Sequence, residues 1–405
     1  MSIGVAGCSD TAAAGLAEQL LASALDFAEL LIEQVLEPAQ ASSQSPGCAK
    51  EIDCTKEIAE IAMLLRLVDR TAVHLPRVAA LAERIAPLAR GRRVRERAVS
   101  RPSQAAPQLL AHGCLHQIGC TDNAFHELAL ATVSASAARA EERVPYRLLD
   151  SGWIRHLLLG DTELDHPALP VSPLGRGVDL IAAGIEEAYA FGHALPYATD
   201  FGRVALADWV DVRWLSEIAD ALILKALDED DLDLLGELLM APALLRLEWS
   251  TIQWFGWQLL IDTWRRYGFV PGPGLPPAAP DETAAQTTER VLGTVYHTTL
   301  VGGLLVATVA SYGYWPLATP PPAATAPVEV VGDRLAWQRF WHRLAPADRC
   351  QLAAVPASLA LHRAVSDCDV RAISDCLRGA QLHLLPGPLV TQTTEFLNRL
   401  VLLIG

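Results

Sequence analysis

Charge, and lysine in particular, is scarce in this sequence, and that scarcity limits what the protein can be. Only 20% of the 405 residues are charged, whereas 51% are hydrophobic, which is enough for a large core. The formal net charge of −15 repels phosphate backbones, so nucleic acid is excluded as a partner. The N-terminus lacks the basic segment and apolar run of a secretory signal. We therefore expect a cytoplasmic protein whose eight cysteines stay reduced.

Several catalytic signatures are also missing. The sequence contains no HExxH, no GxSxG elbow, no P-loop and no dinucleotide fingerprint. Its one ExxH, from Glu163 to His166, is unpaired and lies in a proline-flanked loop, so zinc-protease and ferritin-like di-iron assignments have no support. The cysteines show no CxxC spacing, which argues against redox chemistry.

One stretch lacks charge altogether. Residues 291–328 contain no Asp, Glu, Lys or Arg, and "LVGGLLVATVASYGYWPLA" approaches the length of a membrane span. The same stretch holds several glycines and the polar "YHTT", and it runs into "TPPPAATAP". We expect a buried central helix followed by a proline-rich loop, and no membrane partner.

Helical periodicity is present along most of the chain. The expected helices cover 11–36, 51–70, 74–90, 121–140, 147–158, 178–194, 211–228, 231–245, 250–267, 286–312, 334–345, 347–378 (with a break near Pro356 or Ser366) and 388–404. Residues 91–107 are Arg-rich and then bear Pro and Ser, which indicates a linker. One short strand is expected at Val328, Val330 and Val331.

These patterns predict an all-α protein of stacked helical hairpins, arranged as an α/α toroid or an irregular α-solenoid. The expected parts are an N-terminal hairpin region (1–100), a central domain (108–318) and a C-terminal helical region (328–405) packed on it. Trp254, Trp257 and Trp264 are spaced as one buried helix face, and Ser250 is the expected N-cap of their helix.

The first candidate cluster is "HGCLHQIGCTDNAFHELAL" at residues 112–130. Asp122 and His126 are four residues apart, so they share a helix face and can ligate one metal ion. The alternative is a capping Asp122, a partly buried His126 and scattered polar loop residues.

Two further clusters lie downstream. In "EEAYAFGHALPYATDFG" (residues 186–202), Pro196 is expected to end or kink the helix, so that His193, Tyr197 and Asp200 face one site. His297 stands in the most apolar helix, where a polar group needs a partner. A structural role for each of these residues is the alternative.

Together these residues form a pool for a His/carboxylate site. The expected catalytic residues are His193, Asp200, Tyr197 and His297. The expected metal ligands are Asp122, His126, His193 and His297. Such a set suits one iron or zinc ion, although no cofactor is identified.

The motifs "DNAFHELA", "YAFGHALPYATDFG", "DLDLLGELLMA" and "YHTTLVGGLL" occur in that order. Through them, residues 122–310 resemble an uncharacterised all-helical family of high-GC soil bacteria. The resemblance implies a shape and a candidate site, but no reaction. The chain departs from that family in the cysteine-bearing loop before Asp122 and in both helical flanks.

The leading hypothesis is an enzyme of bacterial specialised metabolism. It would act on a small molecule or a modified peptide through the His/carboxylate site, with oxygenase- or hydrolase-like metal chemistry. The alternatives are a non-catalytic scaffold for a protein or peptide and an apolar-ligand carrier. An enzyme requires at least three of these side chains at one cavity, whereas a scaffold leaves them dispersed. A homo-oligomer is compatible with each reading.

Overall fold

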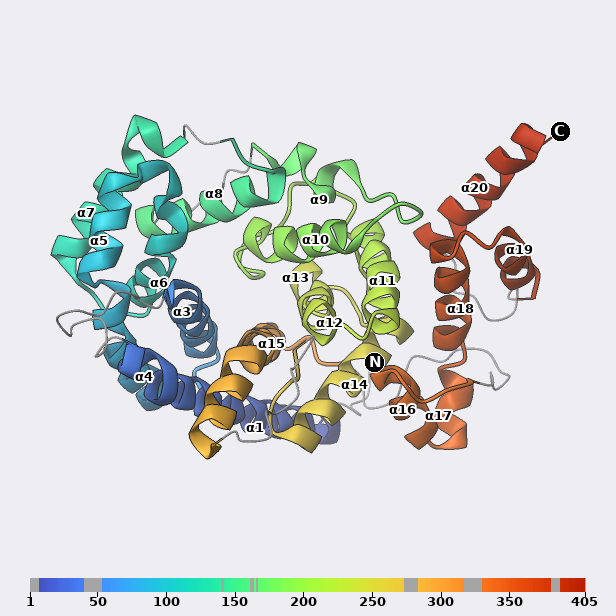
Figure 1. Ribbon diagram of the computed structural model, residues 1–405, viewed down its shortest axis with the longest axis horizontal. Helices are drawn as coiled ribbons and strands as arrows, with labels where there is room; N and C mark the ends of the chain where they lie inside the picture. The colour runs from blue at the N-terminus through green and yellow to red at the C-terminus, as the bar shows by residue number, and fades with distance from the viewer. Residues whose placement is uncertain are drawn as a thin grey trace.

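The computed structural model describes residues 7–39, 53–139, 142–160, 164, 167–272, 283–316, 330–379 and 387–404. Within these residues every regular element is a helix (Figure 1), which confirms the all-α prediction. The strand expected at Val330 and Val331 is wrong, because this segment is irregular and no strand among the described residues is there to pair with it. Val328 lies outside the described residues.

The N-terminal helices include one that is buried along most of its length. They are α1 (Gly7–Leu31) with one π-helical turn after it (Ile32–Leu36), α3 (Thr55–Arg70) and α4 (Leu75–Ala89). α3 packs against α4 and also against two later helices, α6 (Ala105–Gln117) and α15 (Ala284–Tyr312). All residues from 59 to 68 of α3 are buried, including Glu60 and Arg66. These two charged groups therefore need partners inside the protein.

The linker predicted at 91–107 is wrong. Arg92–Ser100 forms helix α5, and α6 begins at Ala105 after one short 3₁₀ turn. The arginines are paired, since Arg92 bonds Glu96 one turn later and Arg97 lies 2.6 Å from Asp53. Because α6 extends to Gln117, His112 and His116 stand on a helix and not on the loop expected there.

The central helices follow the predicted order. They are α7 (Asn123–Ser134), α8 (Pro145–Leu159), α9 (Pro173–Arg176), α10 (Ile185–Ala198), α11 (Val212–Asp228), α12 (Leu232–Leu238), α13 (Ala241–Leu245), α14 (Thr251–Tyr267) and α15. The helix expected over 231–245 is divided, because Pro242 cannot donate a helical hydrogen bond and a new helix starts there. Pro196 does not end α10, which continues through it to Ala198.

Helix α15 is long and apolar enough to cross a membrane by length and composition, but 72% of its most apolar window is buried inside the protein. It packs against α1, α3 and α12. Two adjacent glycines permit this close approach. A Cβ on Gly302 would come within 2.8 Å of the Trp264 ring, and one on Gly303 within 3.0 Å of Ala24. Burial on several sides explains the absence of charge, as the sequence predicts for a central helix.

The C-terminal helices are α16 (Ala336–Arg343), α17 (Pro346–Gln351), α18 (Ala354–Ser366), α19 (Val370–Gly379) and α20 (Pro388–Ile404). The break after Ser366 is confirmed, whereas Pro356 lies inside the first turn of α18, where its missing N–H is not needed. Figure 1 shows α20 extending away from the body.

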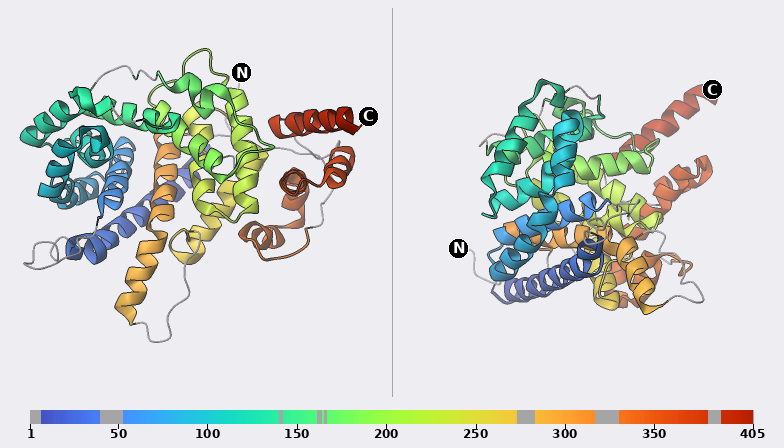
Figure 2. Two further views of the ribbon diagram at one scale, coloured as in Figure 1. Left: turned by 45° about the horizontal axis from the view of Figure 1, so that its top comes forward. Right: turned by 60° about the vertical axis from the view of Figure 1, so that its left-hand side comes forward.

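Figure 1 also shows α3, α6, α8, α10, α12 and α15 placed around the centre of the molecule. The left view of Figure 2 is turned so that the top of the molecule comes forward, which brings α8 and α10 toward the viewer, above α15. The toroid, the solenoid and the division at 100 and 318 stay predictions. The helices α1 and α3 of the predicted N-terminal region pack directly on α15 of the predicted central domain.

Candidate functional site

A cavity of about 860 Å³ lies among the central helices. Its walls come from α3, α6, α8, α10, α12 and α15, which are far apart in the sequence. One part of the wall carries acidic, histidine and tyrosine side chains: Glu60, Asp150, Tyr189, His193, Tyr197, Asp233, Glu237 and His297. Another part is apolar and includes Met63, Leu110, Ile154, Phe201, Met240, Val301 and Leu304. A pocket of this size with a few convergent polar groups is typical of a small-molecule site.

Helix α12 places two carboxylates on the cavity wall. Asp231 caps this helix by accepting hydrogen bonds from the backbone N–H groups of Asp233 (3.1 Å) and Leu234 (3.0 Å). Asp233 and Glu237 are four residues apart and therefore project from the same face. Both are buried, with exposed fractions of 4% and 7%.

Gly192 on the neighbouring α10 makes room for Glu237. A Cβ at position 192 would lie 2.7 Å from Oε2 and 3.3 Å from Cβ of Glu237. Since real Cβ atoms do not approach that closely, the absence of a side chain at 192 lets the Glu237 carboxylate lie against α10.

His297 bridges two carboxylates from different helices. Its Nδ1 lies 2.8 Å from Oε1 of Glu60 on α3, and its Nε2 lies 3.2 Å from Oδ2 of Asp233 on α12. Burial alone would lower the pKa of His297, but the nearby carboxylates of Asp233 and Glu60 raise it to about 10. The same contact lowers the pKa of Asp233, against the effect of its burial. The two carboxylates therefore favour the charged imidazolium form of His297.

His193 and Glu237 are paired on the cavity wall. Nε2 of His193 lies 3.1 Å from Oε1 of Glu237. Burial opposes its charged form, but the Glu237 carboxylate raises the pKa of His193 above its ordinary value. The imidazole is stacked between the rings of Tyr146 and Tyr189, with centroids 5.7 Å and 5.9 Å away. Two tyrosines and a carboxylate thus fix its orientation.

Several polar atoms of this cluster have no hydrogen-bond partner among the described residues. They are Oε2 of Glu60, Oε2 of Glu237, Oδ1 of Asp233, Nδ1 of His193 and Nδ1 of His297, the last of which lies close to Glu60 without hydrogen-bond geometry. Buried polar atoms are normally satisfied by protein groups, water or ions, so these atoms are available to water or to a group bound in the cavity. Asp233, Glu237 and His297 each offer one ligand atom, and these atoms lie within 4.8 Å of one another. Two oxygen donors and one imidazole suit iron, manganese or zinc.

Of the residues predicted from the sequence, His193, Tyr197 and His297 line this cavity. Asp200 is not among the lining residues. Its carboxylate is fully buried and bonds Nη2 of Arg66 (2.9 Å) and Nε1 of Trp153 (2.7 Å), with Arg70 also in contact. Its backbone φ of +45° belongs to a turn that directs the side chain to these arginines.

Asp122 and His126 are not brought together with His193 and His297. Asp122 caps α7 by accepting from the N–H of Phe125 (2.9 Å) and faces Arg95 at 3.6 Å. His126 lies beside His112 and His116. The predicted set of four metal ligands therefore does not form one cluster, because the capping bond and the packing of α7 on α6 direct two of them elsewhere.

Glu60, Asp233 and Glu237 were missed as site residues in the sequence. The signal for the last two was available, because "LDLLGELLM" places two carboxylates one turn apart in an otherwise apolar run. Glu60 has a weaker signal, the second of two acids in "EIAEIAMLL" and the last before an apolar run.

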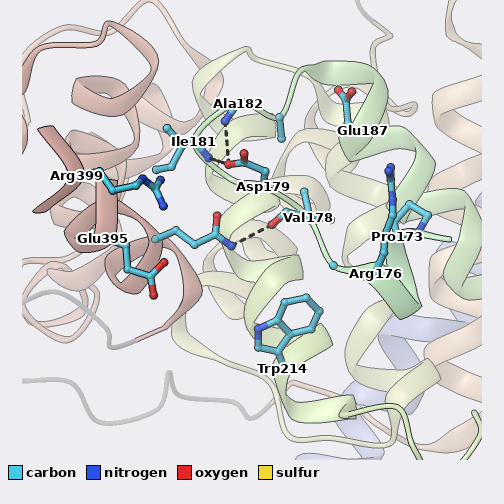
Figure 3. A pocket seen from close by; sticks show the side chains of 13 residues that line it. Pro173, Arg176, Val178, Asp179, Ile181, Ala182, Glu187, Trp214, Glu395 and Arg399 are labelled. Carbon is cyan, nitrogen blue, oxygen red and sulfur yellow. Dashed lines mark hydrogen bonds between the residues drawn. The ribbon is translucent and has the colours of Figure 1, made fainter. Parts of the chain in front are cut away.

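A second hollow of about 610 Å³ lies between α20 and the chain around α9 and α10 (Figure 3). Gln392 of α20 donates to the carbonyl of Val178 (3.0 Å). Figure 3 shows Asp179 accepting from the backbone N–H groups of Ile181 (3.1 Å) and Ala182 (3.3 Å). Its lining includes Arg176, Arg399 and acidic groups but no histidine. These contacts hold α20 against the body, so the hollow is a weaker candidate for chemistry than the central cavity.

Comparison with known proteins adds a family but no reaction. No curated protein matches the chain, and no solved structure matches it. A family model described as a domain of unknown function, DUF6895, matches residues 21–307. This match starts well before residue 122, so the resemblance predicted for 122–310 was drawn too short, and α3 with Glu60 falls within the family region. The residues that line the cavity all lie within the match, and the chain belongs to the DUF6895 family.

Proposed function

We propose that this protein is a metal-dependent enzyme that acts on a small molecule bound in the central cavity. The observation that carries the proposal is the convergence of three carboxylates and two imidazoles on one cavity wall: Glu60, Asp233, Glu237, His193 and His297. A scaffold has no need to gather such groups around a cavity, and an apolar carrier has no need for them at all.

The charge balance of the cluster supports a cation. Three carboxylates face two imidazoles, so the cluster is negative even when both imidazoles are protonated. Lys56 lies 3.6 Å from Glu60 but its side chain is 59% exposed, so it screens the cluster weakly. A divalent ion would neutralise the remaining charge and take up the unpartnered carboxylate oxygens.

The contacts of His297 match those of a metal-bound histidine. Such a ligand commonly donates its second ring N–H to a carboxylate, which fixes the ring and the tautomer. Glu60 stands at that position on Nδ1, while Nε2 is directed toward Asp233. We therefore assign Asp233, Glu237 and His297 as ligands and Glu60 as the group that orients His297. Binding of the ion to one ring nitrogen of His297 would displace the proton that this nitrogen carries in the imidazolium form.

The ion would act as a Lewis acid and lower the pKa of a bound water. His193, paired with Glu237 at the edge of the ligand set, is positioned to move a proton between the substrate and that carboxylate. Tyr197 stacks on Trp153 at 5.1 Å and has a pKa raised well above its ordinary value by burial. It would therefore act as a neutral hydrogen-bond donor.

The apolar side chains that share the cavity with the cluster suit a substrate with an apolar body and one polar, reactive end. We place that polar end at the carboxylates and the body against residues such as Met63, Leu110 and Leu304. The role in bacterial specialised metabolism stays a prediction from the sequence. Zinc would favour hydrolysis, and iron would favour oxygenation.

The test is metal analysis of protein purified without an affinity tag. We expect about one equivalent of iron, manganese or zinc, which is lost in Asp233→Asn and Glu237→Gln. A matched control is Asp122→Asn, which removes a carboxylate outside the cavity and keeps an N-capping side chain. A folded protein that contains no metal and takes up none from iron, manganese or zinc salts would refute the proposal.

The apolar lining supports one second candidate, the binding of an apolar ligand without chemistry. It predicts that native mass spectrometry detects a co-purifying organic molecule whose retention does not change in Asp233→Asn. Loss of the molecule in that variant would favour the enzyme.

A further inference from the structure

A second cluster of histidines lies outside the cavity, where α7 packs on α6. His112 and His116 are one turn apart on α6, and His126 stands in the first turn of α7. Figure 1 places α7 at the outer edge of the molecule. None of the three histidines lines the central cavity.

The three rings are close to one another. Nε2 of His112 lies 3.3 Å from Nδ1 of His126, and the rings of His116 and His126 are stacked with centroids 3.9 Å apart. One nitrogen of each ring can be chosen so that the three nitrogens lie within 4.8 Å of one another. Nδ1 of His116 is buried and has no hydrogen-bond partner among the described residues. His112 is fully buried, and the other two are half-buried, so the cluster opens toward one side.

We propose that His112, His116 and His126 form a site for a divalent transition-metal ion that prefers nitrogen ligands, of the class Zn²⁺, Cu²⁺ and Ni²⁺. Two imidazole nitrogens on one tetrahedral ion, with bonds of about 2.0–2.1 Å, are roughly 3.3 Å apart. The nitrogens of His112 and His126 already have that spacing, because they form a hydrogen bond that the ion would replace. His116 reaches the same ion when its ring turns out of the stack with His126. Three imidazoles with no carboxylate among the ligand atoms favour these ions over Mg²⁺ or Ca²⁺.

Arg90 competes with the ion. Its Nε–H donates to Nδ1 of His112 at 3.0 Å, so the proton of the neutral His112 ring stands on Nε2, the atom that would bind the metal. Loading therefore requires that Arg90 release Nδ1 and that the Nε2 proton depart. Arg90 also donates to the carbonyl of Cys120, which holds its side chain in place. The arginine thus weakens the site, and its removal is expected to tighten metal binding.

The α6–α7 site shares no residue with the metal site proposed in the central cavity, so either proposal can fail while the other stands. The experiment uses the full chain carrying Glu237→Gln, which disables the central site. Co²⁺ is added as a spectroscopic probe, because its visible absorption reports tetrahedral nitrogen ligation, and Zn²⁺ is then titrated against it.

We expect one equivalent of Co²⁺ to bind with a visible absorption band and to be displaced by Zn²⁺. In the same background, His116→Ala and His126→Gln are expected to weaken binding at least about tenfold. Arg90→Met is expected to tighten it several-fold. The matched control is His74→Asn, which removes an exposed histidine and keeps a residue tolerant of its φ of +58°. Thermal melting confirms that each variant is folded.

Absence of Co²⁺ and Zn²⁺ binding in the Glu237→Gln chain would overturn the proposal. Binding that is unchanged in folded His116→Ala and His126→Gln variants would overturn it as well. If Arg90→Met weakens binding, the assigned competition is wrong.

Discussion

The two histidine clusters contain the same side chain in opposite states. In the central cavity, His297 lies between Glu60 and Asp233, and its pKa is raised to about 10. In the α6–α7 cluster, burial and the neighbouring Arg90 lower the pKa of His112 to about 3. Burial opposes the charged form of both rings and is the largest cause of the lowered pKa at His112. At His297 the two carboxylates outweigh burial, whereas at His112 the Arg90 cation acts in the same direction as burial.

The two clusters differ in what a metal ion must overcome in order to bind. The negative charge of the central cluster attracts a cation. Before the cation binds, however, His297 must lose a proton that its two carboxylate partners stabilise. In the α6–α7 cluster, burial lowers the pKa of His112 and of His126, but the ligand set has no carboxylate and a guanidinium lies beside it. We therefore expect the central site to prefer metal ions that bind well to oxygen ligands. We expect the outer site to prefer metal ions that bind best to nitrogen ligands.

The largest expected effect is a loss of stability at high pH in metal-free protein. His297 has a pKa of about 10 when folded and an ordinary value of 6.5. Its stabilisation is therefore complete below pH 6.5 and is lost as pH rises through 10. In EDTA, urea unfolding should show a fall in unfolding free energy on the order of 3 kcal/mol between pH 6.5 and 10. His297→Gln should remove most of this slope, and an equal slope in both proteins would contradict the assignment.

Removal of one carboxylate partner tests the cause of the raised pKa. Asp233→Asn takes away a hydrogen-bonded charge from Nε2 of His297 and leaves Glu60 in place. We expect the pKa of His297 to fall by about two units, measured by NMR titration of labelled histidine in metal-free protein. His112 should not change, since Asp233 is remote from its cluster. An unchanged His297 would mean that Glu60 alone holds the proton.

A smaller effect is expected when the space beside Glu237 is filled. Gly192→Ala adds a methyl group 2.7 Å from the Glu237 carboxylate, which must move away from His193. We expect metal binding to weaken about tenfold and the unfolding free energy to fall by about 1 kcal/mol despite the better helix propensity of alanine. The matched control is Gly293→Ala in α15, whose Cβ meets nothing within 4 Å. If the two variants behave alike, the packing argument fails.

The smallest effect concerns the outer cluster. Arg90→Met removes the cation beside His112 but leaves the ring buried. We expect the pKa of His112 to rise by about one unit and to stay below 6.5, because burial is the larger cause of its shift. NMR titration of the single variant measures it. A rise above 6.5 would show that charge outweighs burial here.

The sequence located part of the central site. His297 stood out as a polar residue in an apolar helix, and His193 and Tyr197 as polar residues beside a proline. All three line the cavity. Glu60, Asp233 and Glu237 were not recognised, because a carboxylate near an acidic helix start resembles an ordinary solvated end. Their burial depends on α12 packing against α10 and α15, and on α3 packing against α15, which no local pattern encodes.

The grouping of the candidates was the least predictable part. Asp122 and His126 share one helix face, as the spacing requires, but a carboxylate oxygen of Asp122 is used by the N–H of Phe125. Asp200 seemed free to face a site, yet two arginines of α3 hold it. The partners of Asp200 lie 134 and 130 residues away along the chain, so no local pattern could reveal them.

The sequence by itself determined the all-α class and most of the helices, including the buried α15, but it did not determine α5 and α6. Helix formation depends on local periodicity, caps and prolines, and burial follows from apolar faces, so both can be read along the chain. Only the tertiary structure decided which histidines meet carboxylates and which meet an arginine. These contacts join residues from separate helices, and the protonation state of each imidazole follows from them because the electrostatic interaction depends on distance in space.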